Sequence, residues 1–273
     1  MSFAYGCVYS PANKKKEMNK STRRKFIRSV SIIGLLTPLI SAANANEILK
    51  GKLISPSKLG AIEKDKYLTS IKAELIKVYP KNKTINLVFH GHSVPSGYFI
   101  TPDVRPFQSY PFLLLKELKK IYPYAVINII LTCIGGENSE QGARRFKKQV
   151  LNHRPDVLFM DYALNDTGIG ATASLKAWEY MIKTGLKNKI KVILLTATPD
   201  QRVDLTDTES DLQKICTQVV DLSKKYQTGL VDNYTGFKNL FSSGEKITDY
   251  MSQVNHPNEK GHQLVVDGIM KYY

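Results

Sequence analysis

Cysteine is scarce in this chain of 273 residues, which contains three. Cys7 lies near the N-terminus, and Cys133 and Cys216 show no spacing of the kind that binds zinc. Two cysteines permit one disulfide in an oxidising compartment but do not require it. A disulfide-rich scaffold is excluded, so the fold must depend on a hydrophobic core. A composition that is 42% hydrophobic and 10% aromatic is sufficient for one.

Long hydrophobic runs are also missing, which argues against a transmembrane anchor. The apolar stretch from Val30 to Ile40 is short; it follows a basic segment and precedes Ala43-Asn44-Ala45, which is small where a signal peptidase reads. Arg23-Arg24, followed by Phe26-Ile27, resembles a twin-arginine export signal. We therefore expect residues 1–45 to direct export to the periplasm or the exterior, with Met18 as a second candidate start. The alternative is an ordinary amphipathic first helix.

Acidic side chains are fewer than basic ones, 24 against 39, which gives a formal charge of +15. The first 45 residues hold eight basic side chains and one acidic side chain, so +7 belongs to the export segment and +8 to the rest. A charge of +8 is typical of a well-solvated surface. Nucleic acid is therefore not an expected partner, and the sequence leaves the oligomeric state open.

Short apolar runs alternate with amphipathic stretches of helical length from residue 84 onward. This pattern predicts an α/β fold with three layers, in which helices cover both faces of a central, mostly parallel five-stranded sheet. We expect a domain over residues 84–273 and an N-terminal extension over residues 46–83. The expected strands are 84–90, 125–132, 156–161, 191–197 and 229–232, and the expected helices are 108–121, 138–152, 173–187, 207–226 and 258–272.

Polar residues follow several of these strands, at the sheet edge where open α/β folds bind ligands. Ser93 follows the first strand, Gly135-Gly136 the second and Asn165-Asp166 the third, while His256 precedes the last helix. A serine needs a base to become a good nucleophile, and a histidine suits that role. A glycine amide and an asparagine side chain can stabilise an oxyanion. Each residue alone also fits a turn or a helix cap.

These residues, in this order, make residues 84–273 resemble an SGNH/GDSL-type hydrolase. The first block reads "GHS" in place of Gly-Asp-Ser, and the third reads "ALND" with Ala163 in place of glycine. The resemblance implies Ser93 as nucleophile and His256 as base, with the oxyanion hole formed by Ser93, Gly136 and Asn165. It also implies a flavodoxin-like sheet and no cofactor.

Two positions depart from the family pattern. The family usually has an aspartate three residues before its histidine, where this chain has Gln253. Asp249 is a tentative third member of the catalytic group if its loop folds back; otherwise a backbone carbonyl serves a Ser-His dyad. His92 replaces the acidic residue beside the nucleophile, and the sequence does not predict the effect of that change.

His90 and His92 alternate along a strand, so both side chains were candidates for one metal site. No HxxxH motif, carboxylate cluster or cysteine ligand accompanies them. We expect no metal, and we expect His90 to be a hydrogen-bonded structural residue beneath the site. Tyr98 and Phe99 are candidates for stacking on a sugar or lining an acyl site.

The sequence thus predicts an exported serine esterase without cofactor, acting on small O-acyl groups and preferably on carbohydrate esters. No stable membrane anchor is expected after signal cleavage. The alternatives are a carbohydrate-binding or envelope-interaction protein that lost catalysis, suggested by Gln253, and a metal hydrolase using His90 and His92.

Overall fold

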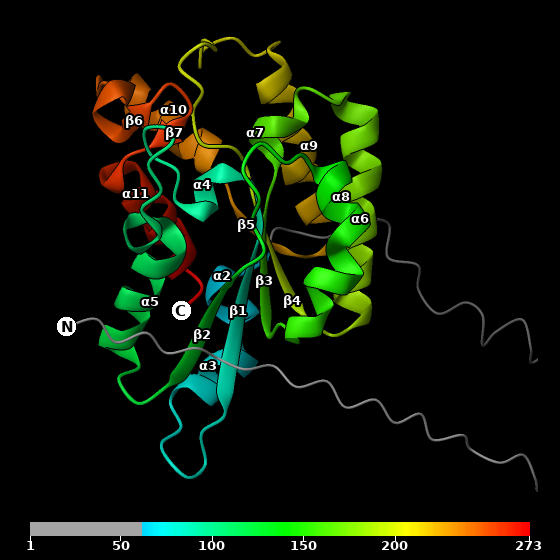
Figure 1. Cartoon of the computed structure of the whole chain (residues 1–273), viewed down its shortest axis with the longest axis vertical. Coiled ribbons are helices and arrows are strands. Elements are labelled where there is room, and N and C mark those ends of the chain that lie inside the picture. Colours follow the sequence, from blue (N-terminus) through cyan, green and yellow to red (C-terminus); the bar gives the residue numbers. More distant parts are fainter. Residues whose placement is uncertain (1–61) are drawn as a thin grey trace, which may run out of the picture. The chain divides into compact units, whose positions relative to one another are not determined.

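A computed structural model describes residues 62–273 as a sheet of five parallel strands between layers of helices (Figure 1). The strand order is β2-β1-β3-β4-β5, and every neighbouring pair is parallel. The expected three-layer α/β architecture is confirmed. The strands are β1 (Thr84–Gly91), β2 (Val126–Leu131), β3 (Val157–Asp161), β4 (Lys191–Leu195) and β5 (Gly229–Val231).

Helices cover both faces of this sheet. In Figure 1 the helices α5 and α11 lie on one side of it and α6, α8 and α9 on the other, and contacts join α5 to α11, α6 to α8 and α8 to α9. The long helices are α5 (Tyr110–Ile121), α6 (Ser139–Gln149), α8 (Gly170–Lys187), α9 (Asp211–Tyr226), α10 (Asn233–Ser242) and α11 (Glu259–Met270). The short elements are α2 (Lys64–Tyr67), α3 (Thr69–Leu75), α4 (Ser93–Ser96), α7 (Ala163–Asp166), and an antiparallel ribbon of β6 (Met251–Gln253) and β7 (His256–Pro257).

The central strands are apolar because both of their faces are covered. Every residue of β3 is buried, and Leu87, Val88 and Phe89 of β1 have no exposed surface. Parallel strands covered on both faces carry near-continuous hydrophobic runs. The rings of Phe89 and Phe159 stack in this core with centroids 4.5 Å apart.

The folded domain begins earlier than the expected boundary at residue 84. Leu68, between α2 and α3, and Ile71 and Leu75 of α3 are buried in the same core as the sheet. Residues 64–75 therefore belong to the domain rather than to an extension. The many charged side chains of this segment concealed this, although Leu68, Ile71 and Leu75 face the core. The expected export signal lies outside the described residues, and within residues 62–273 no helix is long and apolar enough to cross a bilayer.

Two tyrosine hydroxyls form hydrogen bonds with backbone N–H and C=O groups of β4 and β5. Tyr272 Oη accepts a hydrogen bond from Leu230 N at 2.6 Å and donates one to Leu230 O at 2.9 Å. Tyr67 Oη does the same for Val192, with distances of 3.2 Å to N and 2.9 Å to O. A strand at the edge of a sheet leaves such groups without partners. This applies to Leu230 of the edge strand β5 and to Val192 of β4, which precedes the first residue of β4 paired with β5.

Candidate active site

Ser93 lies at the turn where β1 passes into the one-turn helix α4. His92 caps that helix, because its Nδ1 accepts a hydrogen bond from Val94 N at 3.2 Å. The first amides of a helix have no intrahelical acceptor, so the Ser93 N–H is available to a ligand. Gly91 permits the turn: a Cβ there would lie 2.5 Å from Asp161 O.

His256 reaches Ser93 across 163 residues of sequence. Its Nε2 lies 2.9 Å from Ser93 Oγ, and its Nδ1 lies 3.0 Å from the backbone oxygen of Phe99. A carbonyl can only accept, so Nδ1 carries the proton and Nε2 is free to accept one from Ser93. Burial lowers the pKa of His256, against a smaller opposing effect of the Phe99 carbonyl, and His92 lowers it further. The imidazole is therefore neutral near pH 7, as a base must be.

Asp249 does not hold His256 in this structure. Its side chain is exposed, and the backbone carbonyl of Phe99 accepts the Nδ1 hydrogen bond that Asp249 was the candidate to accept. Gln253 also does not contact the imidazole through a hydrogen bond; its Oε1 accepts from Thr101 N at 2.7 Å. The contacts of His256 are therefore with Ser93 and with a backbone carbonyl, the geometry of the second of the two expected possibilities.

Gly136 and Asn165 lie on the loops that follow β2 and β3, the two neighbours of β1. Gly136 is exposed and has φ +77°, a conformation that favours glycine. Asn165 Nδ2 donates to Glu137 O at 2.9 Å, which ties the two loops together. One of its two amide hydrogens is used in this bond, and the other is free for a ligand.

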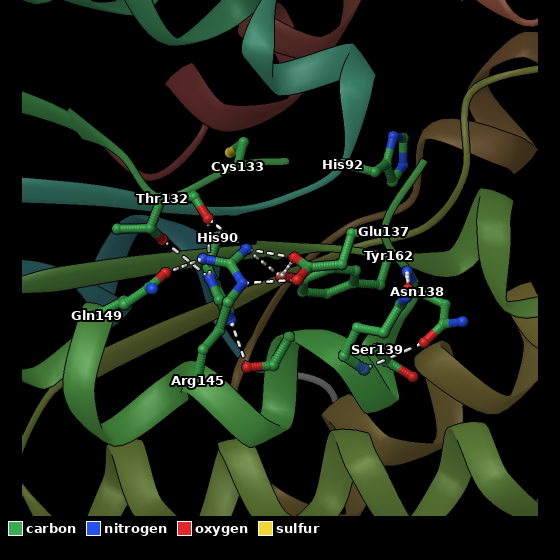
Figure 2. A network of polar contacts seen from close by, with 12 residues as sticks. His90, His92, Thr132, Cys133, Glu137, Asn138, Ser139, Arg145, Gln149 and Tyr162 are labelled. Atoms are coloured by element: carbon green, nitrogen blue, oxygen red, sulfur yellow. Dashed lines mark hydrogen bonds and ion pairs between the residues drawn. The ribbon is translucent and has the colours of Figure 1, made fainter. Parts of the chain in front are cut away.

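The loop that carries Gly136 is anchored by a buried ion pair (Figure 2). Arg145 of α6 binds the Glu137 carboxylate through Nε at 2.7 Å and through Nη2. Tyr162 Oη donates to the same carboxylate at 3.0 Å, and Arg145 Nη2 donates to Thr132 O at 2.6 Å. The carboxylate and the guanidinium are only 7% and 12% exposed. This anchor was missed in the sequence, where Glu137 and Arg145 look like ordinary surface charges.

Asp166, the next residue after Asn165, links two of the helices around the site. Its carboxylate accepts hydrogen bonds from Ser139 N at 2.8 Å and from Ser174 Oγ and Trp178 Nε1, both at 2.7 Å. The carboxylate of this residue, which follows Asn165 in α7, thus joins the start of α6 to α8. Asp166 is fully buried, so its role is structural.

His90 and His92 face different partners and do not form one site. His90 bonds Thr132 Oγ1 at 2.8 Å and Gly142 O at 3.2 Å, the structural position expected for it. Burial lowers its pKa to about 3. His92 Nε2 lies 3.3 Å from Asp161 Oδ1, and His92 stands apart from the Glu137 network in Figure 2. Within residues 62–273 no group of three or more His, Cys, Asp or Glu side chains is arranged to hold a metal ion.

Tyr98 and Phe99 have different surroundings. The Tyr98 ring is partly exposed and lies between His256, with centroids 6.0 Å apart, and Gly135, whose added Cβ would come within 3.2 Å of the tyrosine hydroxyl. Tyr98 therefore forms a wall of the site. The Phe99 ring is 3% exposed and packs on His262, so it cannot stack on a substrate. Phe99 contributes its carbonyl, which no sequence pattern reveals.

The remaining cysteines take no part in this chemistry. Both are free thiols, with Cys216 buried in α9 and Cys133 donating to Phe89 O at 3.2 Å. Burial raises the pKa of Cys216 to about 12. A thiol with a raised pKa is a poor nucleophile.

Comparison with known sequences matches residues 89–264 to the GDSL-like lipase/acylhydrolase family. A curated protein, an uncharacterised lipoprotein YqeF of Bacillus subtilis, is 25% identical over 177 residues, which cover 52% of this chain and 72% of that protein. The range matched by the family, residues 89–264, includes Ser93, Gly136, Asn165 and His256.

Solved structures share the fold. A two-domain esterase active on acetylated mannans has a TM-score of 0.62 at 19% identity over 76% of this chain, which spans about half (52%) of that longer protein. A variant of Axe2, an acetyl xylan esterase from Geobacillus stearothermophilus, has a TM-score of 0.61 at 14% identity, covering 72% of this chain and 96% of the other. The acetyl xylan esterase AlAXEase has a TM-score of 0.57 at 21% identity, covering 68% and 98%.

Proposed function

Because the chain belongs to the GDSL-like lipase/acylhydrolase family, we propose that it is a serine esterase that removes small O-acyl groups, preferably acetyl groups, from carbohydrate. The observation that carries this proposal is the 2.9 Å contact of Ser93 Oγ with His256 Nε2 at the carboxyl edge of the sheet. A serine within hydrogen-bond reach of a neutral, oriented imidazole is the requirement for acyl transfer.

In the proposed reaction His256 Nε2 takes the proton of Ser93 while Oγ attacks the ester carbonyl carbon. The imidazolium that forms keeps its Nδ1 hydrogen bond to the Phe99 carbonyl, and it then donates the Nε2 proton to the leaving alkoxide. Water, deprotonated by the same imidazole, attacks the acyl-enzyme and releases the acid and the free serine.

The oxyanion of each tetrahedral intermediate is stabilised by the amides of Ser93 and Gly136 and by Asn165 Nδ2. Two features support these donors: Ser93 begins a helix, and the bond from Asn165 to Glu137 O holds the other two loops together. Loss of one such donor typically slows turnover by about 10²- to 10³-fold. We expect Asn165→Ala to show a loss of that size, with little change in KM.

The substrate class is supported by the solved relatives, which act on acetylated mannans or are acetyl xylan esterases. Tyr98 supplies a partly exposed ring beside His256, suitable for stacking on a sugar. We expect acetate release from acetylated mannan or xylan, and faster hydrolysis of p-nitrophenyl acetate than of its decanoate analogue. Faster turnover of the decanoate would favour a lipase instead.

The first test compares Ser93→Ala with Ser96→Ala. Ser96 lies on the same turn, but its hydroxyl donates to His92 O and is not in the dyad. We expect Ser93→Ala to abolish hydrolysis of p-nitrophenyl acetate and labelling by a fluorophosphonate, while Ser96→Ala keeps both. Full activity in Ser93→Ala would refute the mechanism.

Gln253 no longer favours the alternative of a binding protein without catalysis. That alternative was suggested by Gln253 in place of the family's aspartate, and the Phe99 carbonyl supplies the acceptor for His256 Nδ1 instead. A purified chain that binds glycan but neither hydrolyses esters nor reacts with the fluorophosphonate would restore it.

We further propose that the protein acts after export, with residues 1–45 as a twin-arginine signal. The similar Bacillus protein is a lipoprotein, which agrees with an extracytoplasmic site. In a bacterial host the exported protein should begin at Asn46 by mass spectrometry. Replacement of Arg23 and Arg24 by lysine should retain it in the cytoplasm; export without processing would contradict this.

A further inference from the structure

The loop of residues 97–105 meets the β6–β7 ribbon at two points. Among the residues described, two hydrogen bonds join them: His256 Nδ1 with Phe99 O, and Thr101 N with Gln253 Oε1. Gln253 and His256 are paired across the ribbon. Paired residues of one ribbon therefore hold two residues of one loop, and the first of the two contacts orients the base.

Hydrogen bonds within the loop brace the segment that holds its two attached residues, Phe99 and Thr101. Its arms are joined by Arg105 N to Gly97 O at 2.7 Å and Phe99 N to Asp103 O at 3.0 Å. On the core side the buried Phe99 ring packs on His262, with centroids 5.4 Å apart. On the outer side, Gln253 Oε1 accepts a hydrogen bond from Thr101 N, which attaches the tip of the loop to the ribbon.

The ribbon itself is held from its other side, so Gln253 is a fixed attachment point. Gln201 N donates to Val254 O at 2.8 Å, and Gln201 Nε2 donates to Gln253 O at 3.3 Å. The backbone of Gln253 is thereby tied to the loop after β4. The amide oxygen of the side chain remains free to accept from Thr101.

We propose that Gln253 is a positioning residue for the dyad, which acts through the loop: its amide oxygen holds Thr101 and thereby keeps the Phe99 carbonyl on His256 Nδ1. This inference rests on the proposed esterase function. The position that carries the aspartate in related enzymes thus has a different task here, because it orients the carbonyl that replaces the carboxylate.

Alignment matters more for a carbonyl than for a carboxylate. A carboxylate attracts the imidazolium by charge from several directions, whereas a neutral N–H···O bond weakens steeply once its angle falls below about 120°. A loop released at Thr101 allows the carbonyl to tilt. Because one neutral hydrogen bond is lost, we expect an effect of about five- to tenfold.

The experiment compares Gln253→Leu with Gln253→Glu in the full chain. Leucine has a similar volume without an acceptor, whereas glutamate keeps an acceptor oxygen at the same reach. On p-nitrophenyl acetate we expect Gln253→Leu to lower kcat about five- to tenfold with KM within twofold, and Gln253→Glu to stay within about twofold of the parent.

A pH profile separates positioning from a general structural effect. The Phe99 carbonyl raises the pKa of His256, so a tilted carbonyl moves the acid limb of the kcat profile of Gln253→Leu to lower pH. The titratable groups that face His256, namely His92, Tyr98 and His262, are the same in both proteins. Unchanged kcat and an unchanged limb in Gln253→Leu would overturn the inference. So would a Gln253→Asp variant faster than the parent, because it would indicate direct action on the imidazole.

NMR titration of the His256 imidazole distinguishes this inference from the proposed function, because it requires no turnover. A lower His256 pKa and a shifted Thr101 amide in Gln253→Leu would support the attachment even in a chain that hydrolyses no ester. An unchanged imidazole pKa in an active esterase would refute the attachment alone. Thermal unfolding followed by Trp178 fluorescence checks that the variants fold.

Discussion

His256 is buried beside Ser93, and its burial has a direct consequence for pH dependence. The pKa of the imidazole lies below its ordinary value of 6.5, and only the neutral form can act as base. As pH falls, kcat/KM should therefore decline with a midpoint below 6.5. A profile on p-nitrophenyl acetate between about pH 4 and 8 measures this limb; a midpoint above 6.5 would contradict the prediction.

His262 lies under the same site and couples stability to pH. It is fully buried, accepts from Tyr110 N at 3.3 Å, and burial lowers its pKa to about 3. In the unfolded chain His262 is protonated below about pH 6.5, whereas in the folded chain it stays neutral down to about pH 3. The free energy of unfolding therefore decreases as pH falls from 6.5 toward 3. The slope is about 1.4 kcal/mol per pH unit for one histidine.

The variant His262→Asn tests this coupling. An asparagine oxygen can accept from Tyr110 N, but the side chain does not titrate. Urea unfolding at pH 7 and pH 5 should show a smaller loss of stability in the variant than in the parent. An equal loss in both proteins would assign the acid sensitivity to other groups, of which His90 is the first candidate.

At the scale of one element, α6 carries the guanidinium that holds the loop of Gly136, one of the proposed oxyanion donors. Arg145→Met leaves the Glu137 carboxylate buried without its partner, which typically costs about 3–5 kcal/mol. Arg144 is the matched control, because its side chain is 73% exposed and lies 3.7 Å from Glu140. We expect Arg145→Met to lower both Tm and kcat and Arg144→Met to change neither by much. Similar behaviour of the two variants would show that the ion pair does not position the loop.

The edge formed by β4 and β5 makes a second prediction at this scale. Tyr272→Phe leaves Leu230 N and O without the hydroxyl that serves both, at a cost of about 1–3 kcal/mol. Tyr273 provides the control, since its buried hydroxyl has no hydrogen-bond partner in the described part of the chain. Chemical denaturation should show a clear loss for Tyr272→Phe and a smaller one for Tyr273→Phe. The reverse order would refute the role of the edge hydroxyls.

The sequence predicted the strands and long helices well where hydrophobic period and length agreed. The run at residues 156–161 became β3, and the helical spacing around Trp178 became part of α8. The helix α10 and the β6–β7 ribbon were missed, because their short segments lack a clear period. Ser93 and His256 could be named as candidates because the identity of a side chain, and so its chemical capacity, can be read from the sequence. The Phe99 carbonyl was not assigned, because every residue has a carbonyl and only the fold selects one.

At the scale of the whole molecule, several side chains have roles that depend on contacts with distant segments and could not be predicted from the sequence. Glu137 and Arg145 are eight residues apart and look like solvated charges, yet the turn before α6 buries them together. His92 stands where the family has an acidic residue; its Nδ1 caps α4, and its Nε2 lies 3.3 Å from Asp161 Oδ1, which comes from β3. Contacts between distant segments decide such roles, and a single sequence does not encode them locally.

The contact of Ser93 with His256 closes a chain segment of 163 residues, whereas Trp178 meets Asp166 within 12. Long closures form late, and domains of more than about 150 residues often fold through intermediates. On dilution from denaturant, Trp178 fluorescence should therefore recover before ester hydrolysis does. Turnover that returned first would contradict this order. If the proposed dyad is correct, recovery of catalysis reports the completion of folding, because β7, which carries His256, must first reach the turn after β1, which carries Ser93.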